Sequence, residues 1–510
     1  MSKYILTIDQ GTTSTRAIIF DDKSQVVGLK QMEFLQICPH SGWVEHNPEE
    51  IWETTYQVIK GALNSSNLKL SDISGIAITN QRETTIIWDK KTGKPVYNAI
   101  VWQSRQSQDI CDELINRGYS DFIQAKTGLI INPYFSASKI KWIFDNVKGT
   151  KKRAENGNLL FGTIDSYLVW KLTNGKVHIT DYSNASRTLL YNIHTLEWDD
   201  ELLELFKIPK SILPSVVSNS GVVGYASALK DLDDSNYEIP IAAMIGDQQA
   251  ALFGQCCFNI GDAKSTYGTG CFILMNTGDK IITSKNGLLT TIGWKIDNQV
   301  TYALEGSVFV AGSGIQWLRD GLEFFEKSSD CEKYIKSKNP AGGVYIVPAF
   351  VGLGTPYWDN DVRGAIFGLT RATNKENIIA AMLNAIAFQA KDVMDVMVDE
   401  LGYKMQYLGV DGGASANNYL MQFQADLLNV KLMKPKCLET TALGATYLAG
   451  LAVGVYKSID EIKRMHNTEQ VFISNMSDEI RNEQIKNWKK AVEATMKYKK
   501  EKRGKENGTI

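Results

Sequence analysis

Short hydrophobic runs that end in polar turns recur along the chain and predict its first strands. Residues 4–8 (YILTI) form one such run, which ends at the turn DQG (9–11), and residues 17–20 (AIIF) form the next. Runs of this length bounded by turn residues are typical of buried strands, and two in immediate succession predict a hairpin. The tip of that hairpin consists of small and polar side chains.

A helical pattern follows at NPEE (47–50), where Asn can cap a helix, Pro suits its first position and the acids favour its positive end. Apolar residues then recur on one face, at Ile51, Val58, Ile59, Ala62 and Leu63. A buried strand at 73–78 runs directly into a polar cluster. We expect helices near 104–117 and 136–147 and a strand followed by a helix near 159–172 to complete a first α/β region.

The same order of elements begins again near residue 262. A strand at 263–267 leads to the turn Gly268-Thr269-Gly270 and then to a second strand at 271–275. Farther on, Thr373 and Glu376 have the spacing of a capping box at the start of a long apolar helix. A strand at 407–410 then ends in DGGA (411–414). The pattern predicts two α/β lobes, each with a polar turn aimed at a shared cleft.

Composition narrows the class of protein. A chain of 510 residues is expected to form two or three domains, and a net charge of −2 gives no reason to expect nucleic acid or an anionic membrane as partner. Seven Cys without CxxC pairs or a secretory leader indicate reduced thiols, and five His without HxxxH spacing argue against zinc catalysis. No apolar run is long enough for a membrane span. The basic tail from Lys497 to Lys505 is interpreted as a frayed helix end.

The turn Asp9–Arg16 (DQGTTSTR) has the strongest chemical character in the chain. Backbone N–H groups and four hydroxyls at a tight turn are donors for a polyphosphate, and Arg16 adds a fork-shaped cation. Asp9, at the end of a buried strand, is placed to contact Mg²⁺. A plain hairpin explains the same residues equally well. The GxxxxGK[ST] loop is absent, so an ATP site here would belong to another class.

Two further turns have the same character. Gly268-Thr269-Gly270 occupies the corresponding place in the second lobe, and DGGASAN (411–417) offers glycines for close backbone approach, with Asn417 able to bond a base or ribose. Each is weak evidence alone. Together with the first turn they favour a nucleotide bound between two domains.

Charged residues also follow buried strands without a spacer. Arg82-Glu83 comes after the strand at 73–78 and is a candidate pair for gripping vicinal hydroxyls, although a surface ion pair would look the same. Asp247 follows the strand at 241–245 and could accept or orient a hydroxyl proton, or serve as an ordinary turn residue.

With these residues collected, the chain resembles the FGGY family of carbohydrate kinases over about residues 3–456, most closely the members that act on glycerol. The resemblance is carried by GWVEHNP (42–48), ITNQRETT (78–85), YNAIVWQ (97–103), YFSASKIKWIFDN (134–146), DYSNASRT (181–188), GDQQAALFGQ (246–255), YGTGCF (267–272), VPAFVGLGTPYWD (347–359), RGAIFGLTR (363–371) and DGGASANN (411–418).

The resemblance implies an α/β fold of two ribonuclease-H-like lobes of the actin and sugar-kinase superfamily around an interdomain cleft, with lobes at 1–253 and 254–510. It implies a polyol site made of Arg82, Glu83, Tyr134, Asp247, Gln248 and Phe272. It implies a nucleotide site made of Thr12, Thr13, Ser14, Arg16, Thr269, Gly312, Gln316, Gly413 and Asn417. Asp247 would be the general base and Asp9 the magnesium contact.

The implied reaction is ATP-dependent phosphorylation of glycerol to sn-glycerol 3-phosphate with Mg²⁺, by a cytoplasmic homodimer or homotetramer. The segment Ser227–Tyr237 (SALKDLDDSNY) is acidic where relatives inhibited by fructose 1,6-bisphosphate are basic, so we expect no such inhibition. A kinase for another polyol or ketose, such as xylulose or ribulose, is an alternative within the family. An ATP-driven conformational machine of the actin type is an alternative from another class.

Overall fold

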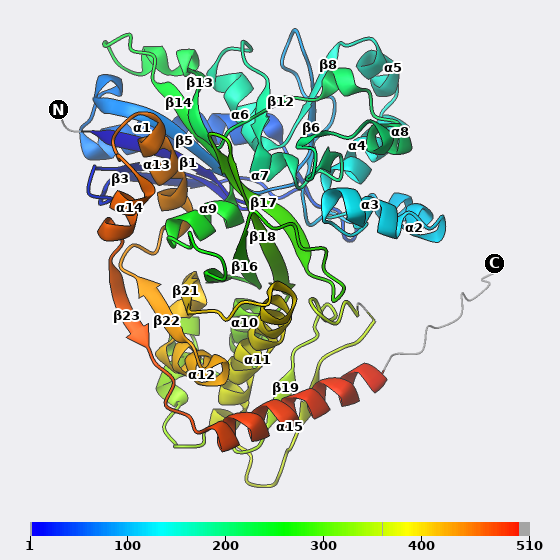
Figure 1. The fold of residues 1–510 in the computed structure, drawn as a ribbon, viewed down its shortest axis with the longest axis vertical. Helices are drawn as coiled ribbons and strands as arrows, with labels where there is room; N and C mark the ends of the chain where they lie inside the picture. Colours follow the sequence, from blue (N-terminus) through cyan, green and yellow to red (C-terminus); the bar gives the residue numbers. More distant parts are fainter. Residues whose placement is uncertain (1–2, 360, 499–510) are drawn as a thin grey trace.

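Two α/β lobes, each built on one large sheet, make up the computed structural model, which describes residues 3–359 and 361–498 (Figure 1). The N-terminal sheet has six strands. Across the sheet they are β13 (Ser220–Tyr225), β14 (Pro240–Gly246), β5 (Ile73–Asn80), β1 (Tyr4–Gln10), β2 (Ser14–Phe20) and β3 (Val26–Glu33). The predicted hairpin is confirmed, since β1 and β2 pair antiparallel from Ile5↔Phe20 to Gln10↔Thr15.

The C-terminal sheet has seven strands and repeats that plan. Across the sheet they are β17 (Leu289–Ile296), β18 (Gln299–Val308), β16 (Cys271–Gly278), β15 (Ala263–Tyr267), β21 (Tyr407–Asp411), β22 (Lys431–Pro435) and β23 (Thr468–Phe472). In both sheets a first strand pairs antiparallel with the second and parallel with a later one, β1 with β5 and β15 with β21. The expected duplication of two α/β lobes is confirmed.

The helices of the N-terminal lobe lie where the apolar pattern predicts them. Helix α1 (Pro48–Ser66) begins with Pro at its first position, and the side chain of Asn47 accepts a hydrogen bond from the backbone N–H of Glu49. The other predicted elements correspond to α2 (Gln108–Asn116), α4 (Ser136–Asn146), β8 (Leu159–Gly162) and α6 (Ile164–Leu172).

The long helix α11 (Lys375–Leu401) corrects the predicted cap. Asn374, not Thr373, is the N-cap, and its side chain accepts from the backbone N–H groups of Glu376 and Asn377. Thr373 instead accepts from the backbone N–H of Thr370, and the Glu376 carboxylate caps a neighbouring loop at Lys336 and Ser337. Asn is preferred to Thr as an N-cap, so local preference favours the residue that serves.

Two helices cross between the sheets and join the lobes. Helix α9 (Asp247–Gly254) follows the N-terminal sheet but contacts β15 and β16, whereas α13 (Thr440–Ala452), from the other end of the chain, contacts β1, β5 and β14. Glycines permit the crossing: a Cβ on Gly444 would lie 1.9 Å from the carbonyl oxygen of Ala250. Figure 1 shows both helices above the C-terminal sheet and beside the N-terminal one.

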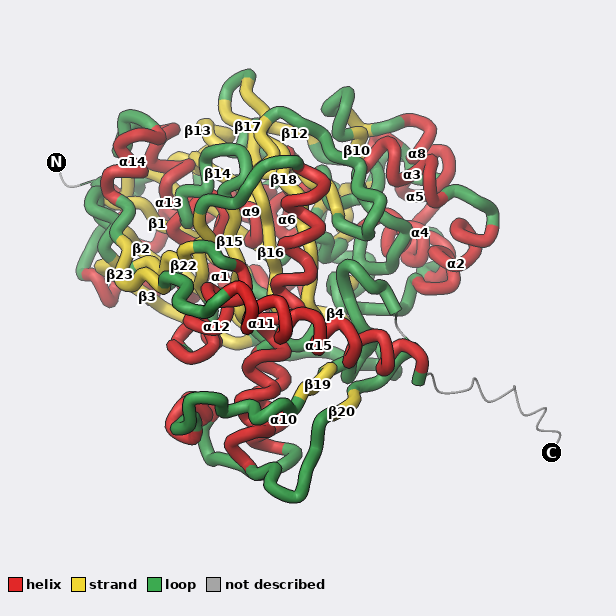
Figure 2. The backbone as a smooth tube through the Cα atoms, turned by 60° about the horizontal axis from the view of Figure 1, so that its bottom comes forward, coloured by secondary structure: helices red, strands yellow, loops and turns green. Residues whose placement is uncertain are grey.

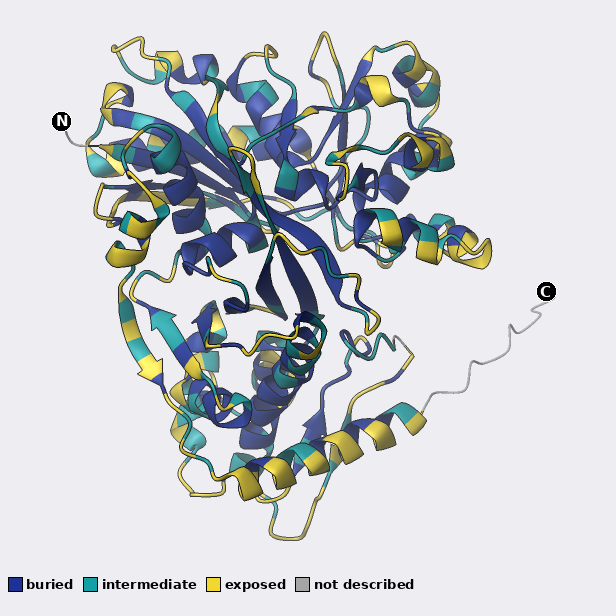
Figure 3. Ribbon diagram, in the orientation of Figure 1, coloured by how far each residue is buried: buried dark blue, intermediate teal, exposed yellow. Residues whose placement is uncertain are grey.

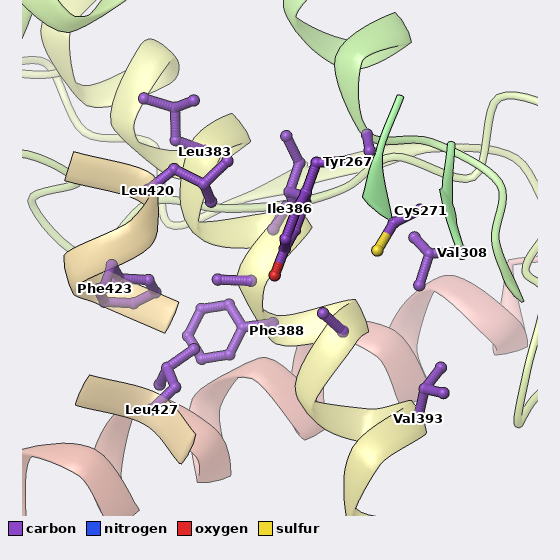
Figure 4. Close-up of a cluster of buried hydrophobic side chains, with 14 of the residues drawn as sticks. Tyr267, Cys271, Val308, Leu383, Ile386, Phe388, Val393, Leu420, Phe423 and Leu427 are labelled. Atoms are coloured by element: carbon purple, nitrogen blue, oxygen red, sulfur yellow. The ribbon is translucent and has the colours of Figure 1, made fainter. Parts of the chain in front are cut away.

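Burial follows the layers. The central strands of both sheets are buried, whereas the edge strands β3, β13 and β23 are largely half-buried or exposed and α15 (Asp478–Lys497) is buried along only one face (Figure 3). That helix runs across the C-terminal lobe beside α12 (Asn418–Leu428) and β19 (Tyr345–Val347) (Figure 2). Aromatic and aliphatic side chains from α11, α12 and the central strands fill the core beneath it (Figure 4). Beyond Tyr498 the predicted basic tail lies outside the described residues.

Within the described residues, no helix has both the length and the hydropathy needed to cross a membrane. The seven cysteines are all free thiols, and only Cys38 is exposed.

Candidate active site

The sheet topology brings the predicted charged residues together. Strands β1, β5 and β14 are parallel neighbours, so their carboxyl ends lie at one edge of the N-terminal sheet. Asp9 lies near the end of β1, Arg82-Glu83 follow β5, and Asp247 follows β14. This is the edge where ligands bind in open α/β sheets. The structure therefore places at one edge of the sheet side chains that are up to 238 residues apart in the sequence.

Asp247 pairs with Arg82, whose Nε lies 3.2 Å from Oδ1 of the carboxylate. The Asp247 side chain is 30% exposed, although it lines neither of the two cavities described below. Burial raises the pKa of this carboxyl to about 6, although the Arg82 guanidinium acts in the opposite direction. Such a group is ionised at neutral pH and still basic enough to take a proton.

Arg82 and Glu83 are more enclosed than the sequence suggested. Arg82 donates from both terminal nitrogens to Glu305, at 2.5 and 3.1 Å, and Glu83 accepts from Nε of Arg187 at 2.6 Å. Glu83 has a backbone φ of 60°, in the left-handed region that a non-glycine residue rarely adopts. Strain of this kind is concentrated at functional sites.

Sequence reasoning missed Arg187 and Glu305 as site residues. A signal was present, because Glu305 is the only charge in the apolar stretch 302–310 (YALEGSVFV). A charge in a buried strand needs a partner, and Arg187, in one of the family-like stretches, is that partner. Lys264 was missed as well: it is buried on β15, and its Nζ donates to the side chains of Gln248 at 2.5 Å and Thr266 at 3.0 Å.

A cavity of about 600 Å³ lies beside these charges. Six predicted residues line it: Thr12, Thr13, Tyr134, Gln248, Thr269 and Phe272. Trp102, which the sequence analysis did not select, stands edge-on to Tyr134 at 5.5 Å and to Phe272 at 6.3 Å between ring centroids. Its indole N–H also donates to the Thr12 hydroxyl at 3.0 Å. The cavity thus has an aromatic wall that touches the turn at residues 11–13.

A second cavity, of about 370 Å³, meets the first at Gly268-Thr269. It is lined by the predicted residues Thr269, Gly312, Gln316, Gly413 and Asn417. A Cβ on Gly413 would meet no atom within 4 Å, so the backbone there is open to a ligand. Asn417 caps α12 through Oδ1 and donates from Nδ2 to the Cys331 sulfur, so both ends of its amide have protein partners.

The segment Asp9–Arg16 differs from the prediction, because Asp9 and Gln10 belong to β1 and Ser14–Arg16 belong to β2, which leaves only residues 11–13 as the turn. Arg16 forms ion pairs with Asp9 and with Glu439, the latter at 2.6 Å, so its charge is already compensated. The Ser14 hydroxyl accepts a hydrogen bond from Gln31 at 3.0 Å. Neither cavity is lined by Ser14 or Arg16, whereas Thr12 and Thr13 both reach the larger one.

The described residues contain no group of three or more His, Cys, Asp or Glu side chains that could hold a metal ion. Mg²⁺ does not require one, because it keeps several waters and binds through one or two carboxylates together with substrate phosphates. Asp9 fits that mode, in competition with the Arg16 guanidinium.

Comparison with known sequences identifies the family. Residues 4–254 match the N-terminal domain of the FGGY family of carbohydrate kinases, and residues 263–453 match its C-terminal domain. The chain belongs to the FGGY family of carbohydrate kinases. The resemblance found in the sequence is thereby confirmed, and with it the kinase class and the two-lobed fold.

Named members of this family align over almost the whole chain. A glycerol kinase of Brevibacillus brevis is 58% identical over 98% of this chain and 99% of its own length, and one of Bacillus subtilis is 57% identical over 98% and 100%. Among solved FGGY structures, a Plasmodium falciparum glycerol kinase with ADP superimposes with a TM-score of 0.91 at 38% identity, covering 97% of this chain and 98% of that one.

Proposed function

We propose that this chain transfers the γ-phosphoryl group of ATP to a terminal hydroxyl of glycerol, releasing ADP and sn-glycerol 3-phosphate. The observation that carries the proposal is the Asp247–Arg82 pair beside a cavity that the phosphate-binding turn and the Gly268-Thr269 turn both reach. The relatives named glycerol kinase, 57–58% identical over 98% of the chain, support glycerol as the acceptor and ATP as the donor.

The acceptor would lie between charges and aromatic rings. Arg82, Glu83, Asp247 and Gln248 offer donors and acceptors for hydroxyls, and the phenol of Tyr134, 3.4 Å from Arg82 Nη2, closes the polar side. Phe272 would pack on the carbon skeleton, because its ring belongs to the aromatic wall. Such a wall favours a short acceptor, since a longer chain would have to displace a ring.

The nucleotide would occupy the second cavity, with its phosphates at the junction of the two. The absence of a side chain at Gly413 lets the nucleotide approach the backbone closely. The nucleotide contacts expected from the sequence are Thr12, Thr13, Ser14, Arg16, Thr269, Gly312, Gln316, Gly413 and Asn417. For Arg16 to bind phosphate, it would have to exchange one of its two carboxylate partners for a phosphate oxygen. Asp9 would then be released to contact a magnesium ion, which shields the phosphate charge when bound.

Asp247 would act as the general base. Its ionised carboxylate accepts the proton of the terminal hydroxyl while the oxygen attacks phosphorus, and Arg82 keeps the carboxylate oriented. Lys264, buried beneath Gln248, holds that side chain against the acceptor. Closure of the lobes around both substrates would exclude the water that otherwise hydrolyses ATP.

The decisive experiment is a coupled assay of ADP release with glycerol, xylulose, ribulose or no acceptor. Glycerol is expected to give the highest kcat/KM, with little turnover when no acceptor is present. A preference for either ketose would make the chain a different sugar kinase of the family. Turnover that does not depend on any acceptor would favour an ATP-driven machine.

A further inference from the structure

A cluster of buried charges lies behind the proposed polyol site. The side chains of Arg82, Glu83, Arg187 and Glu305 are each no more than 2% exposed, and Asp247 touches the cluster from the cleft side. Burying ions is costly unless each finds partners in good geometry. The cluster is therefore a feature that the fold maintains against a cost.

The members of this cluster come from both lobes. Glu305 belongs to β18 of the C-terminal sheet, whereas Arg82 and Glu83 follow β5 and Arg187 follows α7 (Tyr182–Ala185) in the N-terminal half. Glu305 accepts from Arg82 Nη1 at 2.5 Å, from Arg82 Nη2 at 3.1 Å and from Arg187 Nη2 at 2.9 Å. One carboxylate of the second lobe thus anchors two guanidiniums of the first.

The donor inventory of Arg82 shows what this anchor does. A guanidinium has five N–H donors in a rigid plane. Four face Glu305 Oε2, Glu305 Oε1, Gln249 Oε1 at 3.2 Å and the Tyr134 hydroxyl at 3.4 Å, and Nε faces Asp247 at 3.2 Å. Because the plane is rigid, the two bonds to Glu305 set the direction of Nε. Glu305 thereby determines where Arg82 meets Asp247.

Arg187 extends the same support to Glu83. Its Nε donates to Glu83 at 2.6 Å and its Nη2 to Glu305 at 2.9 Å, and its guanidinium lies over the rings of Tyr134 and Phe135 at 5.6 and 5.2 Å. Its Nη1 is buried and has no hydrogen-bond partner. Without Glu305, Arg187 would keep a single carboxylate partner and would no longer hold Glu83 in a fixed place.

We propose that Glu305 is a positioning residue for the phosphoryl transfer, supplied by the C-terminal lobe, which orients Arg82 directly and Glu83 through Arg187. The inference rests on the proposed function, because it assigns Glu305 a role in binding the same acceptor. It adds a charged residue to the part that the C-terminal lobe takes in acceptor recognition through Phe272. Glu305 acts on the acceptor through the two arginines.

The charges of the cluster make the pKa of Asp247 a useful measurement, because a purely structural role of Glu305 would leave that pKa unchanged. Asp247 is faced by Arg82, Glu83, Lys264 and the backbone N–H of Gln248, and Glu305 is faced by Arg82, Arg187 and Lys264. Glu305 shares the positive charge of Arg82 with Asp247. Removing the Glu305 charge leaves more of that positive charge to stabilise ionised Asp247, so its pKa falls.

The test compares Glu305→Gln with the wild-type chain in steady-state kinetics. We expect the KM for glycerol to rise about tenfold or more and kcat to fall, because a buried charge pair loses one partner. The KM for ATP should stay within about twofold, since no bond of Glu305 reaches the second cavity. The acidic limb of the pH profile of kcat should move to lower pH by about half a unit or more.

Two further variants complete the experiment. Glu305→Asp keeps the charge but shortens its reach by one methylene, so we expect a folded protein with an intermediate KM for glycerol, raised about threefold or more. Tyr302→Phe is the matched control, because Tyr302 on the same strand also bonds across the lobes, to the carbonyl of Ile193 at 2.7 Å, away from the cluster. It should keep the wild-type KM for glycerol and the wild-type pH profile.

The proposal is overturned if Glu305→Gln keeps the wild-type KM for glycerol and pH profile, or if the KM values for ATP and glycerol rise together. Should Glu305→Gln give no folded protein, Glu305→Asp decides alone, and a wild-type KM for glycerol in that variant refutes the role. All measurements use the acceptor that the wild-type chain phosphorylates. A wrong acceptor and a wrong role for Glu305 therefore give different results.

Discussion

At the scale of single residues, the chemistry depends on charges whose surroundings set their protonation. Asp247 lies between solvent in the cleft and the guanidinium of Arg82, so it is neither a free surface carboxylate nor a fully compensated ion pair. Glu305 illustrates the other extreme: burial alone would raise its pKa, but Arg187 and Arg82 outweigh burial and lower it to about 2. Asp247 and Glu305 both pair with Arg82, and yet their surroundings give them different pKa values and different roles.

Replacing Asp247 by Asn should reduce kcat by about 10²- to 10⁴-fold, the usual contribution of a general base. The amide keeps the shape but cannot accept the proton, so the Kd for ATP should change little. In the wild-type chain kcat should decline as pH falls through about 6, because Asp247 becomes protonated there. Stopped-flow or coupled assays from pH 5 to 8 measure both effects. Near-wild-type kcat in the Asn variant would refute the assignment.

At the scale of elements, the crossing of α9 and α13 connects the lobes to the site. Asp247 and Gln248 are the first two residues of α9, so the position of this helix sets the position of the proposed base. The backbones approach so closely that added Cβ atoms on Gly254 and Gly444 would lie 2.0 and 1.9 Å from carbonyl oxygens of the opposite helix. Only backbone movement could relieve such contacts.

We therefore expect Gly444→Ala to lower the free energy of unfolding by about 1–3 kcal/mol, as overpacking does, and to lower kcat as well because α9 must shift. Thermal unfolding and steady-state kinetics measure the two effects. Ala452→Ser, half-buried at the end of the same helix, is the control and should change stability by less than about 0.5 kcal/mol. Wild-type stability in Gly444→Ala would mean that the helices separate at no cost.

At the scale of the whole molecule, stability in acid is a balance between buried groups of opposite kind. His46 is fully buried. Its Nε2 lies 2.9 Å from Gln36 Oε1, which can only accept a hydrogen bond, so the proton of the neutral ring is on Nε2 and Nδ1 is unprotonated. Burial lowers its pKa to about 4. Asp392, which accepts from Tyr357 and Trp488, has its pKa raised to about 6 by burial. Acid therefore costs stability through His46 and adds it through Asp392.

The variants His46→Gln and Asp392→Asn should depart from the wild-type chain in opposite directions between pH 6.5 and 4. Between these pH values His46 is protonated in the unfolded chain but not in the folded one. The His46→Gln variant should therefore lose less stability on acidification than the wild-type chain. The free energy of unfolding of this variant should differ from that of the wild-type chain by up to ~1.4 kcal/mol per pH unit. The Asp392→Asn variant should gain less stability on acidification than the wild-type chain, since its folded state no longer takes up a proton at this position.

Urea unfolding at half-unit pH steps measures both differences relative to the wild-type chain. Parallel curves for His46→Gln and the wild type would show that His46 is protonated in the folded state. Curves that diverge in the same direction for both variants would likewise contradict the balance described above.

Local pattern was sufficient to predict the strands and helices that the sequence analysis named. The existence of the strands and the Asn47-Pro48 start of α1 depend on neighbours along the chain, and the structure confirms them, although β1 and β2 extend into the predicted turn at 9–16. The sequence placed Arg82-Glu83 and Asp247 directly after buried strands, but the strand order β14-β5-β1 that brings them to one edge came with the structure. Because parallel neighbours align their carboxyl ends, that order puts the three side chains at the same edge of the sheet.

Pairings between distant segments came only with the tertiary structure. No local rule links Glu305 to Arg82 across 223 positions or makes Arg16 share its charge with Glu439. The α9–α13 crossing is of the same kind. Backbone propensity acts over a few residues, whereas the partner of a buried charge is chosen by how two sheets and two helices pack. The amino-acid sequence by itself therefore indicated the candidate residues, and the packing of the tertiary structure decided which side chains pair with them and fix their positions.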